Sequence, residues 1–189
     1  MKNERKLIEQ TIDSEYVFDG VLLKVYRDRA RLPSGDSSVR EWIRHPGASA
    51  ILPLFENGDV MLIKQFRYPM SQIFYEVPAG KIDSGEDPLQ TGVRELREEV
   101  GLSAKNWRYL GLFYPSIGYT NEVIHLYLAT GLDHHSSNTD DDEFVIPERV
   151  PFAEAVNMVH RGDITDGKTM ITILRAWQVS QEISSSAGS

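Results

Sequence analysis

Residues 80–102 read GKIDSGEDPLQTGVRELREEVGL and contain six acidic side chains. Asp87 and Pro88 form a helix start signal, because Asp accepts hydrogen bonds from free backbone N–H groups and Pro is tolerated at the first helical position. Gly101 is the expected end, since glycine takes the left-handed cap conformation at little cost. We therefore expect a helix over residues 88–100.

This helix should have an apolar stripe and an acidic flank. At about 100° per residue, the stripe expected to pack into the core comprises Leu89, Val93, Leu96 and Val100. Glu95, Glu98 and Glu99 share the flank, where like charges destabilise an isolated helix by roughly a few tenths of a kcal/mol per pair. Mg²⁺ removes such repulsion and commonly uses one or two protein carboxylates together with substrate phosphate oxygens. These residues alone leave two alternatives open, a cation-binding flank and a solvated acidic face in which Arg94 pairs with Glu98.

The wider spacing of residues 80–102 resembles the Nudix signature GX5EX7REUXEEXGU, in which U is aliphatic, at every fixed position. The resemblance to Nudix hydrolases covers about residues 48–183. It implies an α/β fold, an α/β/α sandwich with a mixed sheet flanked by the signature helix and two C-terminal helices. An N-terminal antiparallel strand arm is expected ahead of this sandwich.

The resemblance also implies a reaction, in which water attacks a phosphorus of a nucleoside diphosphate linked to another group. Mg²⁺, or Mn²⁺, is the implied cofactor. The implied metal ligands are the backbone carbonyl of Ala79 and the carboxylates of Glu95, Glu98 and Glu99. Glu98 and Arg94 are expected to be catalytic, with Arg94 orienting the carboxylates through charge-assisted hydrogen bonds. Gly80 and Glu86 are expected to support the metal-binding loop.

Two stretches resemble the branch of the family that cleaves ADP-ribose and other nucleoside diphosphate sugars. Residues 65–67 (QFR) resemble its QxR stretch, and residues 75–80 (YEVPAG) resemble its ExPAG stretch. On that resemblance Arg67 contacts a phosphate and Glu76 serves the substrate side. The alternatives are a surface salt bridge for Arg67 and a strand-edge carboxylate for Glu76.

Two loops complete the predicted site. Residues 115–122 (PSIGYTNE) resemble the SPGxSxE segment that shapes the ribose pocket, with Glu122 as its final acid. Ile117 stands where that segment usually has proline, so the sugar preference stays open. In the acidic run before Phe144, the resemblance to this branch implies a base toward the attacking water, with Glu143 expected first and Asp142 second; the residues alone favour a solvated loop.

The N-terminal part predicts a small sheet. Residues 14–32 and 39–45 alternate as two strands around a turn cluster at 32–36, and so small a sheet is marginal by itself. It should pack against the rest of the chain or a second copy, and the resemblance favours a homodimer. Trp42 and Phe18 are candidates to stack on the nucleotide base, with arm core as the alternative. The predicted domains are residues 1–46 (arm), 47–183 (Nudix domain) and 184–189 (disordered tail).

The main domain should contain five strands and two C-terminal helices. Asn57 and Gly58 predict a hairpin turn between strands at 48–55 and 60–66. Further strands are expected at 73–77, 107–114 and 123–129, and helices at 152–161 and 169–183. His134 and His135 are interpreted as surface residues, because no third ligand has metal-binding spacing.

Composition narrows the classes of partner. The chain has 189 residues, and 20 Lys and Arg against 28 Asp and Glu give a net charge of −8, which argues against nucleic acid as a partner. Zero cysteines exclude disulfides, thiolate metal sites and a cysteine nucleophile. We see neither a signal-like segment nor an apolar run near the ~18 residues of a membrane span, so no membrane partner and a cytoplasmic location are expected.

Two other functions remain open from the sequence. One is a Nudix hydrolase acting on GDP-mannose or a dinucleoside polyphosphate. The other is a non-catalytic Nudix-fold sensor that binds ADP-ribose without cutting it. The complete signature and the lack of a basic helix-turn-helix segment favour an enzyme whose substrate is a nucleotide sugar.

Overall fold

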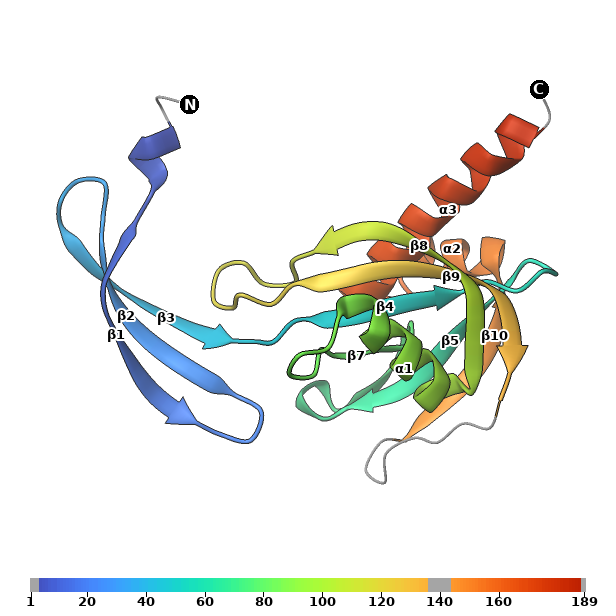
Figure 1. Cartoon of the computed structure of the whole chain (residues 1–189), viewed down its shortest axis with the longest axis horizontal. Coiled ribbons are helices and arrows are strands. Elements are labelled where there is room, and N and C mark those ends of the chain that lie inside the picture. Colours follow the sequence, from blue (N-terminus) through green and yellow to red (C-terminus); the bar gives the residue numbers. More distant parts are fainter. Residues whose placement is uncertain (1–3, 136–143, 188–189) are drawn as a thin grey trace. The chain divides into compact units, whose positions relative to one another are not determined.

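The computed structural model describes residues 4–135 and 144–187. The chain divides into two compact units (Figure 1). The first is Met1–His45 with Ser116–Glu122, and the second is Pro46–Pro115 with Val123–Ser189.

The first unit is a three-stranded antiparallel sheet in the order β1-β2-β3. Its elements are the 3-10 helix η1 (Glu4–Leu7), β1 (Gln10–Asp19), β2 (Lys24–Arg31) and β3 (Ser37–Arg44). The single strand predicted over residues 14–32 is therefore wrong. The chain turns at residues 20–23, where the Gly20 N–H donates to the Leu23 carbonyl at 2.9 Å. Apolar residues inside this turn extend the alternating pattern, which concealed the break between the strands.

The two faces of this small sheet differ in chemistry. One face carries an aromatic ladder, with ring centroids 4.8 Å apart for Tyr16 and Tyr26 and 4.9 Å apart for Tyr26 and Trp42. The other carries ion pairs, such as Arg27 with Glu41 at 3.1 Å. All ten residues of β1 are exposed. As expected for so small a sheet, the unit has little core of its own.

Residues 116–122, predicted to shape the ribose pocket, belong to this first unit. The Ile43 N–H donates to the Tyr119 carbonyl at 2.8 Å, and the His45 N–H donates to Asn121 Oδ1 at 2.8 Å. The loop thus extends the end of β3.

The second unit contains two sheets. A mixed sheet has the order β7-β4-β9-β8, in which only β4 and β9 run parallel. Its strands are β4 (Ala48–Pro53), β7 (Ala79–Lys81), β8 (Leu102–Phe113) and β9 (Ile124–His134). An antiparallel sheet has the order β10-β5-β6. Its strands are β5 (Asp59–Arg67), β6 (Gln72–Glu76) and β10 (Val145–Pro151), with the 3-10 helix η2 (Tyr68–Met70) between β5 and β6.

Three α-helices accompany these sheets: α1 (Pro88–Val100), α2 (Phe152–Arg161) and α3 (Gly167–Ala187). The first two match the predicted ranges. Helix α3 continues to Ala187, so residues 184–187, predicted as part of a disordered tail, lie in the helix. In the part of the chain that the structure describes, no helix combines the length and apolar character needed to cross a membrane.

The predicted hairpin around Asn57 and Gly58 forms only at its turn. The Phe55 N–H donates to the Asp59 carbonyl at 2.9 Å, and a single bridge joins Leu54 to Val60. Beyond it β4 and β5 enter different sheets. β9 pairs with β4 from Ala48 to Pro53, and β7 takes the other edge at residues 48–50, so β5 does not continue the hairpin along β4.

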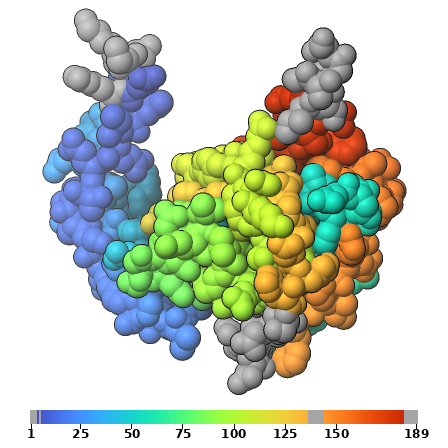
Figure 2. Space-filling view, turned by 45° about the vertical axis from the view of Figure 1, so that its right-hand side comes forward, coloured from blue at the N-terminus to red at the C-terminus, as the bar shows by residue number. Residues whose placement is uncertain are grey.

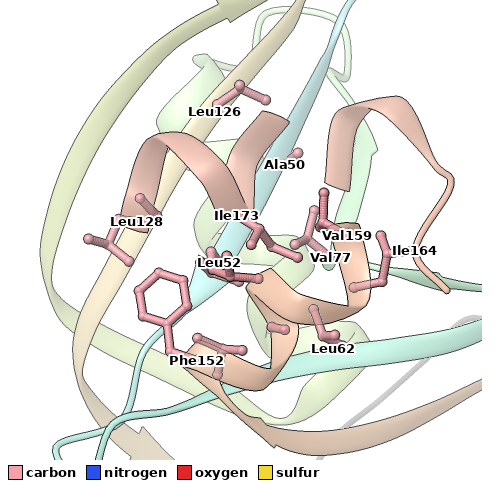
Figure 3. Close-up of a cluster of buried hydrophobic side chains, with 14 of the residues drawn as sticks. Ala50, Leu52, Leu62, Val77, Leu126, Leu128, Phe152, Val159, Ile164 and Ile173 are labelled. Carbon is pink, nitrogen blue, oxygen red and sulfur yellow. The ribbon is translucent and has the colours of Figure 1, made fainter. Parts of the chain in front are cut away.

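The mixed sheet is packed on both faces. Along β4, Ala50 and Leu52 point into one apolar cluster with α2 and α3 (Figure 3). Ile51 points into a second cluster with α1. A strand buried on both faces needs apolar residues at successive positions, and β4 is buried throughout. The predicted α/β/α sandwich with a mixed sheet is confirmed, with a second sheet that the sequence did not separate.

Candidate active site

Helix α1 begins and ends where the sequence predicts. Asp87 Oδ1 accepts from the Leu89 N–H at 2.8 Å, and Gln90 Oε1 accepts from the Asp87 N–H at 3.2 Å, which makes a capping box. Gly101 ends the helix in the left-handed region with φ of 63°. The helix lies at the surface of the second unit (green in Figure 2).

The predicted buried stripe of α1 is only half right. Leu96 and Val100 are buried, but Leu89 and Val93 are 36% and 45% exposed. The helix instead turns Gly92, Glu95 and Glu99 toward the sheet. Gly92 packs closely on the sheet, where a Cβ would meet side chains at an ordinary contact distance of 3.4 Å.

Two buried glutamates meet the backbone of Ala79 and Gly80. Glu99 is 1% exposed, and its Oε2 accepts from the Ala79 N–H at 3.0 Å. Glu95 is 7% exposed, and a Cβ at Gly80 would lie 1.7 Å from its Oε1. Burying a carboxylate is unfavourable unless it is paired. Gly80 leaves the space for the Glu95 carboxylate, and the Ala79 N–H provides a hydrogen-bond donor for Glu99.

Arg94 joins the carboxylates of the loop and of the helix. Its Nε donates to Glu86 Oε1 at 3.1 Å, and its Nη1 donates to Glu95 Oε1 at 2.7 Å and Glu98 Oε2 at 3.0 Å. Its Nη2 donates to the Lys81 carbonyl at 3.1 Å. The hydrogen bond to Glu86 is the main cause that raises the pKa of the Arg94 guanidinium above its usual value. One guanidinium therefore fixes three carboxylates.

Glu86 is held from two sides. Besides Arg94, the Thr91 hydroxyl donates to its Oε2 at 2.7 Å. These hydrogen bonds, that of Arg94 first, lower the pKa of Glu86 to about 2 and outweigh the opposing effect of burial. Glu86 stays ionised throughout the neutral range and ties the loop to α1.

The arrangement suits a hard divalent cation. Glu95, Glu98 and Glu99 and the Ala79 carbonyl are oxygen donors, and the two buried carboxylates approach the same stretch of backbone. Within residues 4–135 and 144–187, no three His, Cys, Asp or Glu side chains form a ready metal-ligand group, and Arg94 holds Glu95 and Glu98 in ion pairs. Mg²⁺ requires only one or two protein carboxylates when phosphate and water complete its shell. The donor set therefore fits such a cation.

Beside this cluster, a buried carboxylate binds two cations. Glu76 is 2% exposed and accepts from Arg67 Nε and Nη2, both at 2.7 Å. The ammonium of Lys168 also bonds Glu76 Oε2 and lies 3.0 Å from Asp166. Burial alone would raise the pKa of Glu76, but the hydrogen bonds and charges of Arg67 and Lys168 hold it below its usual value.

Other residues predicted for the site lie elsewhere in the chain. Trp42, Phe18 and Glu122 belong to the first unit, where Trp42 stacks on Tyr26 and Glu122 lies 3.8 Å from His45. Their roles stay predictions. Glu143 and Asp142 lie outside the described residues.

The histidine pair at the end of β9 has ordinary local partners. His134 stacks on Phe55, and the His135 ring lies 2.8 Å from the Ser103 hydroxyl. These contacts agree with the interpretation of both as surface residues.

Sequence reasoning missed four residues of this region: Thr91, Asp166, Lys168 and Thr169. Thr91 stands at an unconstrained position of the signature, and residues 166–168 precede the helix predicted over residues 169–183. Asp is a preferred N-cap residue, because its carboxylate accepts from a backbone N–H two or three residues later, as Asp166 does from the Thr169 N–H. That pattern signals the start of α3, but it does not reveal that Lys168 reaches Glu76.

The comparison with known families agrees with this geometry, since a model of the NUDIX domain matches residues 43–172. The chain belongs to the Nudix family. It is therefore an enzyme, a Nudix hydrolase, as the sequence predicted, and members of this family use a divalent metal.

Relatives extend the likeness over nearly the whole chain. The ADP-ribose pyrophosphatase of Bacillus subtilis (strain 168) is 37% identical over 171 residues, covering 89% of this chain and 92% of that protein. The methanol dehydrogenase activator of Bacillus methanolicus is 38% identical over 167 residues, covering 87% and 90%. The crystal structure of an ADP compounds hydrolase superposes with a TM-score of 0.79 over 92% of this chain and 95% of that one. Its sequence identity is 22%, so this likeness shows the Nudix fold.

Proposed function

We propose that this Nudix hydrolase cleaves the pyrophosphate bond of ADP-ribose, or of a related nucleoside diphosphate sugar, with Mg²⁺ as the working cation. The observation that carries the proposal is the meeting of Glu95 and Glu99 at the backbone of Ala79 and Gly80. The name of the Bacillus subtilis relative supports ADP-ribose as the first substrate to test. Water adds to one phosphorus, the bond to the bridging oxygen breaks, and a nucleoside monophosphate and a sugar phosphate leave.

In this mechanism the chain holds the cation with Glu95, Glu98, Glu99 and the Ala79 carbonyl. When bound, the cation neutralises charge on the diphosphate and makes water a better nucleophile. Arg94 keeps the carboxylates in position, and Glu86 anchors Arg94 to the loop. Arg94 and the Ala79 N–H thus hold the carboxylates of Glu95, Glu98 and Glu99 at one end of the loop.

Arg67 is proposed to bind a phosphate of the substrate. Its Nε and Nη2 both donate to Glu76, and its side chain is 43% exposed. The two N–H groups of Nη1 remain to meet an anion. Glu76 then contributes to substrate binding indirectly, because it orients the Arg67 guanidinium.

The remaining predicted roles complete the proposal. Trp42 and Phe18 stack on the base, Glu122 contacts the sugar, and Glu143, or Asp142, receives the proton of the attacking water. Replacing Glu143 by Gln and Asp142 by Asn in separate variants identifies the base, because only one of the two changes should lower kcat strongly. A cytoplasmic location stays a prediction.

We also propose that residues 1–46 act as a dimerisation arm. The tip of the β1–β2 hairpin exposes four large apolar side chains, namely Phe18, Val21, Leu22 and Leu23. Exposed apolar groups of this size commonly mark a protein interface. Light scattering after gel filtration should give the mass of a dimer for the wild type and of a monomer after Leu22→Asp.

A substrate panel tests the central proposal. ADP-ribose, GDP-mannose and a dinucleoside polyphosphate are each incubated with the protein and either Mg²⁺ or EDTA, and nucleotide products are separated by chromatography. We expect AMP from ADP-ribose, only with Mg²⁺ and fastest of the panel. Faster turnover of another compound would reassign the substrate, and tight binding of ADP-ribose without cleavage would identify a sensor.

A further inference from the structure

The first turn of α3 forms hydrogen bonds to residues 76 and 77, in the segment that leads into the proposed metal-binding cluster. The Val77 N–H donates to Thr169 Oγ1 at 3.0 Å, across 92 residues of sequence. The neighbouring Lys168 bonds Glu76 across an equal separation. The two interactions hold consecutive residues at the end of β6. The side chains of Val77 and Ile173 lie in the same apolar cluster, so packing reinforces this contact (Figure 3).

The same segment is fixed further along by other elements. The Pro78 carbonyl accepts from the Ile51 N–H at 2.9 Å, and the Ala79 N–H donates to Glu99 at 3.0 Å. Residues 76–79 are therefore anchored at each position. Two side chains bring a positive charge to Glu76 at the start of the segment, Arg67 from β5 and Lys168 from α3.

The charges around Glu76 show why a second cation matters. The Lys168 side chain is 14% exposed, and its ammonium forms ion pairs with Glu76 and with Asp166. Asp166 in turn accepts from the Thr169 N–H at 3.0 Å and the Thr169 hydroxyl at 2.6 Å, which fixes the start of α3. A carboxylate buried as deeply as Glu76 is destabilising unless its charge is compensated. Without Lys168, Arg67 would be the only cation bonded to Glu76 among residues 4–135 and 144–187.

We propose that Lys168 is a positioning residue for Arg67. The ammonium of Lys168 compensates part of the negative charge of Glu76 and fixes the position of its carboxylate. The Glu76 carboxylate then accepts hydrogen bonds only from Nε and Nη2 of Arg67, and Nη1 of Arg67 stays directed to the substrate diphosphate. The inference rests on the proposed function, since it needs a diphosphate that Arg67 binds. Lys168 does not itself contact the substrate.

The test compares substrate binding with turnover. Lys168→Met should raise the KM for ADP-ribose at least about tenfold while kcat changes less than about threefold, because the lost contact is made in the ground state and the transition state alike. Calorimetry with AMP, which has no pyrophosphate bond to cleave, should show a similar loss of affinity. Lys168→Arg, which restores a cation beside Glu76, should recover most of both values.

A matched control uses another Lys–Glu pair on the neighbouring strand. Lys64 bonds Glu148 at 2.5 Å. Lys64→Met should leave KM, kcat and AMP affinity near the wild-type values. An equal KM increase in this control would mean that removing any lysine of the unit affects binding, and it would overturn the inference.

A double variant separates positioning from direct contact. In Glu76→Gln the buried charge is gone, so adding Lys168→Met should raise KM much less than it does in the wild-type background. If Lys168→Met is equally harmful in both backgrounds, Lys168 acts on the substrate itself and the inference is wrong. An unchanged KM in the single variant would also refute it.

Folding defects and failure of the proposed function remain distinguishable. If Lys168→Met melts below the assay temperature, Lys168→Gln, which keeps a donor but not the charge, carries the same expectation. A wild-type protein that releases no AMP from ADP-ribose would refute the proposed function. A wild-type protein that does so, with an unaltered KM in the Lys168 variants, would refute only the role of Lys168.

Discussion

Gly80 and Glu95 are so close that no side chain fits between them: a Cβ on Gly80 would lie 1.7 Å from Oε1 of Glu95. Any other residue at position 80 must displace a buried carboxylate that Arg94 also holds at 2.7 Å. The first glycine of the Nudix signature is thus required here by the volume of a proposed metal ligand. The backbone conformation does not demand it, since Gly80 is not among the glycines with positive φ.

Gly80→Ala should lower kcat for ADP-ribose at least about 100-fold, because displacing a ligand by the order of 1 Å can cause such a loss. AMP release measures the effect. Gly92→Ala is the matched control in the same signature, since its Cβ would meet Ile51 and Trp107 at an ordinary 3.4 Å. The control should keep activity and gain roughly 0.5–1 kcal/mol of stability from the better helix former. Full activity in Gly80→Ala would contradict this account of the site.

Arg94→Lys should lower both turnover and the melting temperature. A single ammonium cannot reproduce the planar fork that joins Glu86, Glu95 and Glu98. Arg97→Lys, an exposed position on the same helix, is the control and should change neither quantity appreciably. Thermal melts and AMP release provide the measurements, and similar behaviour of the two variants would argue against a special role for Arg94.

Glu86 should make stability depend on pH in the acid range. Its pKa in the folded protein is about 2, below the ordinary 4.5, so its contribution is present above pH 4.5 and is lost as the pH falls toward 2. The melting temperature of the wild type should therefore exceed that of Glu86→Gln at neutral pH, and the difference should shrink below pH 4.5. A difference that stays constant down to pH 2 would show that Glu86 is not held by charge.

Glu99→Gln should abolish most activity and leave the fold intact. The amide oxygen can still accept from the Ala79 N–H, now 3.0 Å from Glu99 Oε2, but the negative charge for the cation is lost. We expect a loss of roughly two or more orders of magnitude in kcat, with a nearly unchanged melting temperature. Titration calorimetry should also show weaker Mg²⁺ binding by the variant, and EDTA should abolish the hydrolytic activity of the wild type. Activity that survives EDTA would disprove the metal assignment.

The sequence predicted best those features that local chemistry determines. Asp87, Pro88 and Gly101 fixed the ends of α1 because capping depends on a few adjacent backbone groups. The rotation of α1 was partly mispredicted, since the wheel assumed that aliphatic residues must face the core. Tertiary partners reversed that choice: the Ala79 N–H and Arg94 allow Glu99 and Glu95 to be buried, while Leu89 and Val93 are left more exposed.

Features that depend on distant partners were not accessible from the sequence. β4 and β5 diverge into separate sheets because β7 and β9 pair with opposite edges of β4. The bond of Lys168 to Glu76 joins residues 92 positions apart, and no periodic pattern connects them. The signature revealed the residues proposed for the chemistry, whereas the residues that support Arg67 emerged only from the fold.

The contact between Thr169 and Val77 also bears on biosynthesis. A ribosome that has just made the complete Nudix signature has not yet made α3, the element that clamps residues 76–79 and compensates the charge of Glu76. The nascent polypeptide would then carry all the glutamates proposed to bind the cation but lack the lysine and threonine that hold the adjoining segment. Maturation of the enzyme should therefore be completed only after α3 has emerged from the ribosome and docked on residues 76–79.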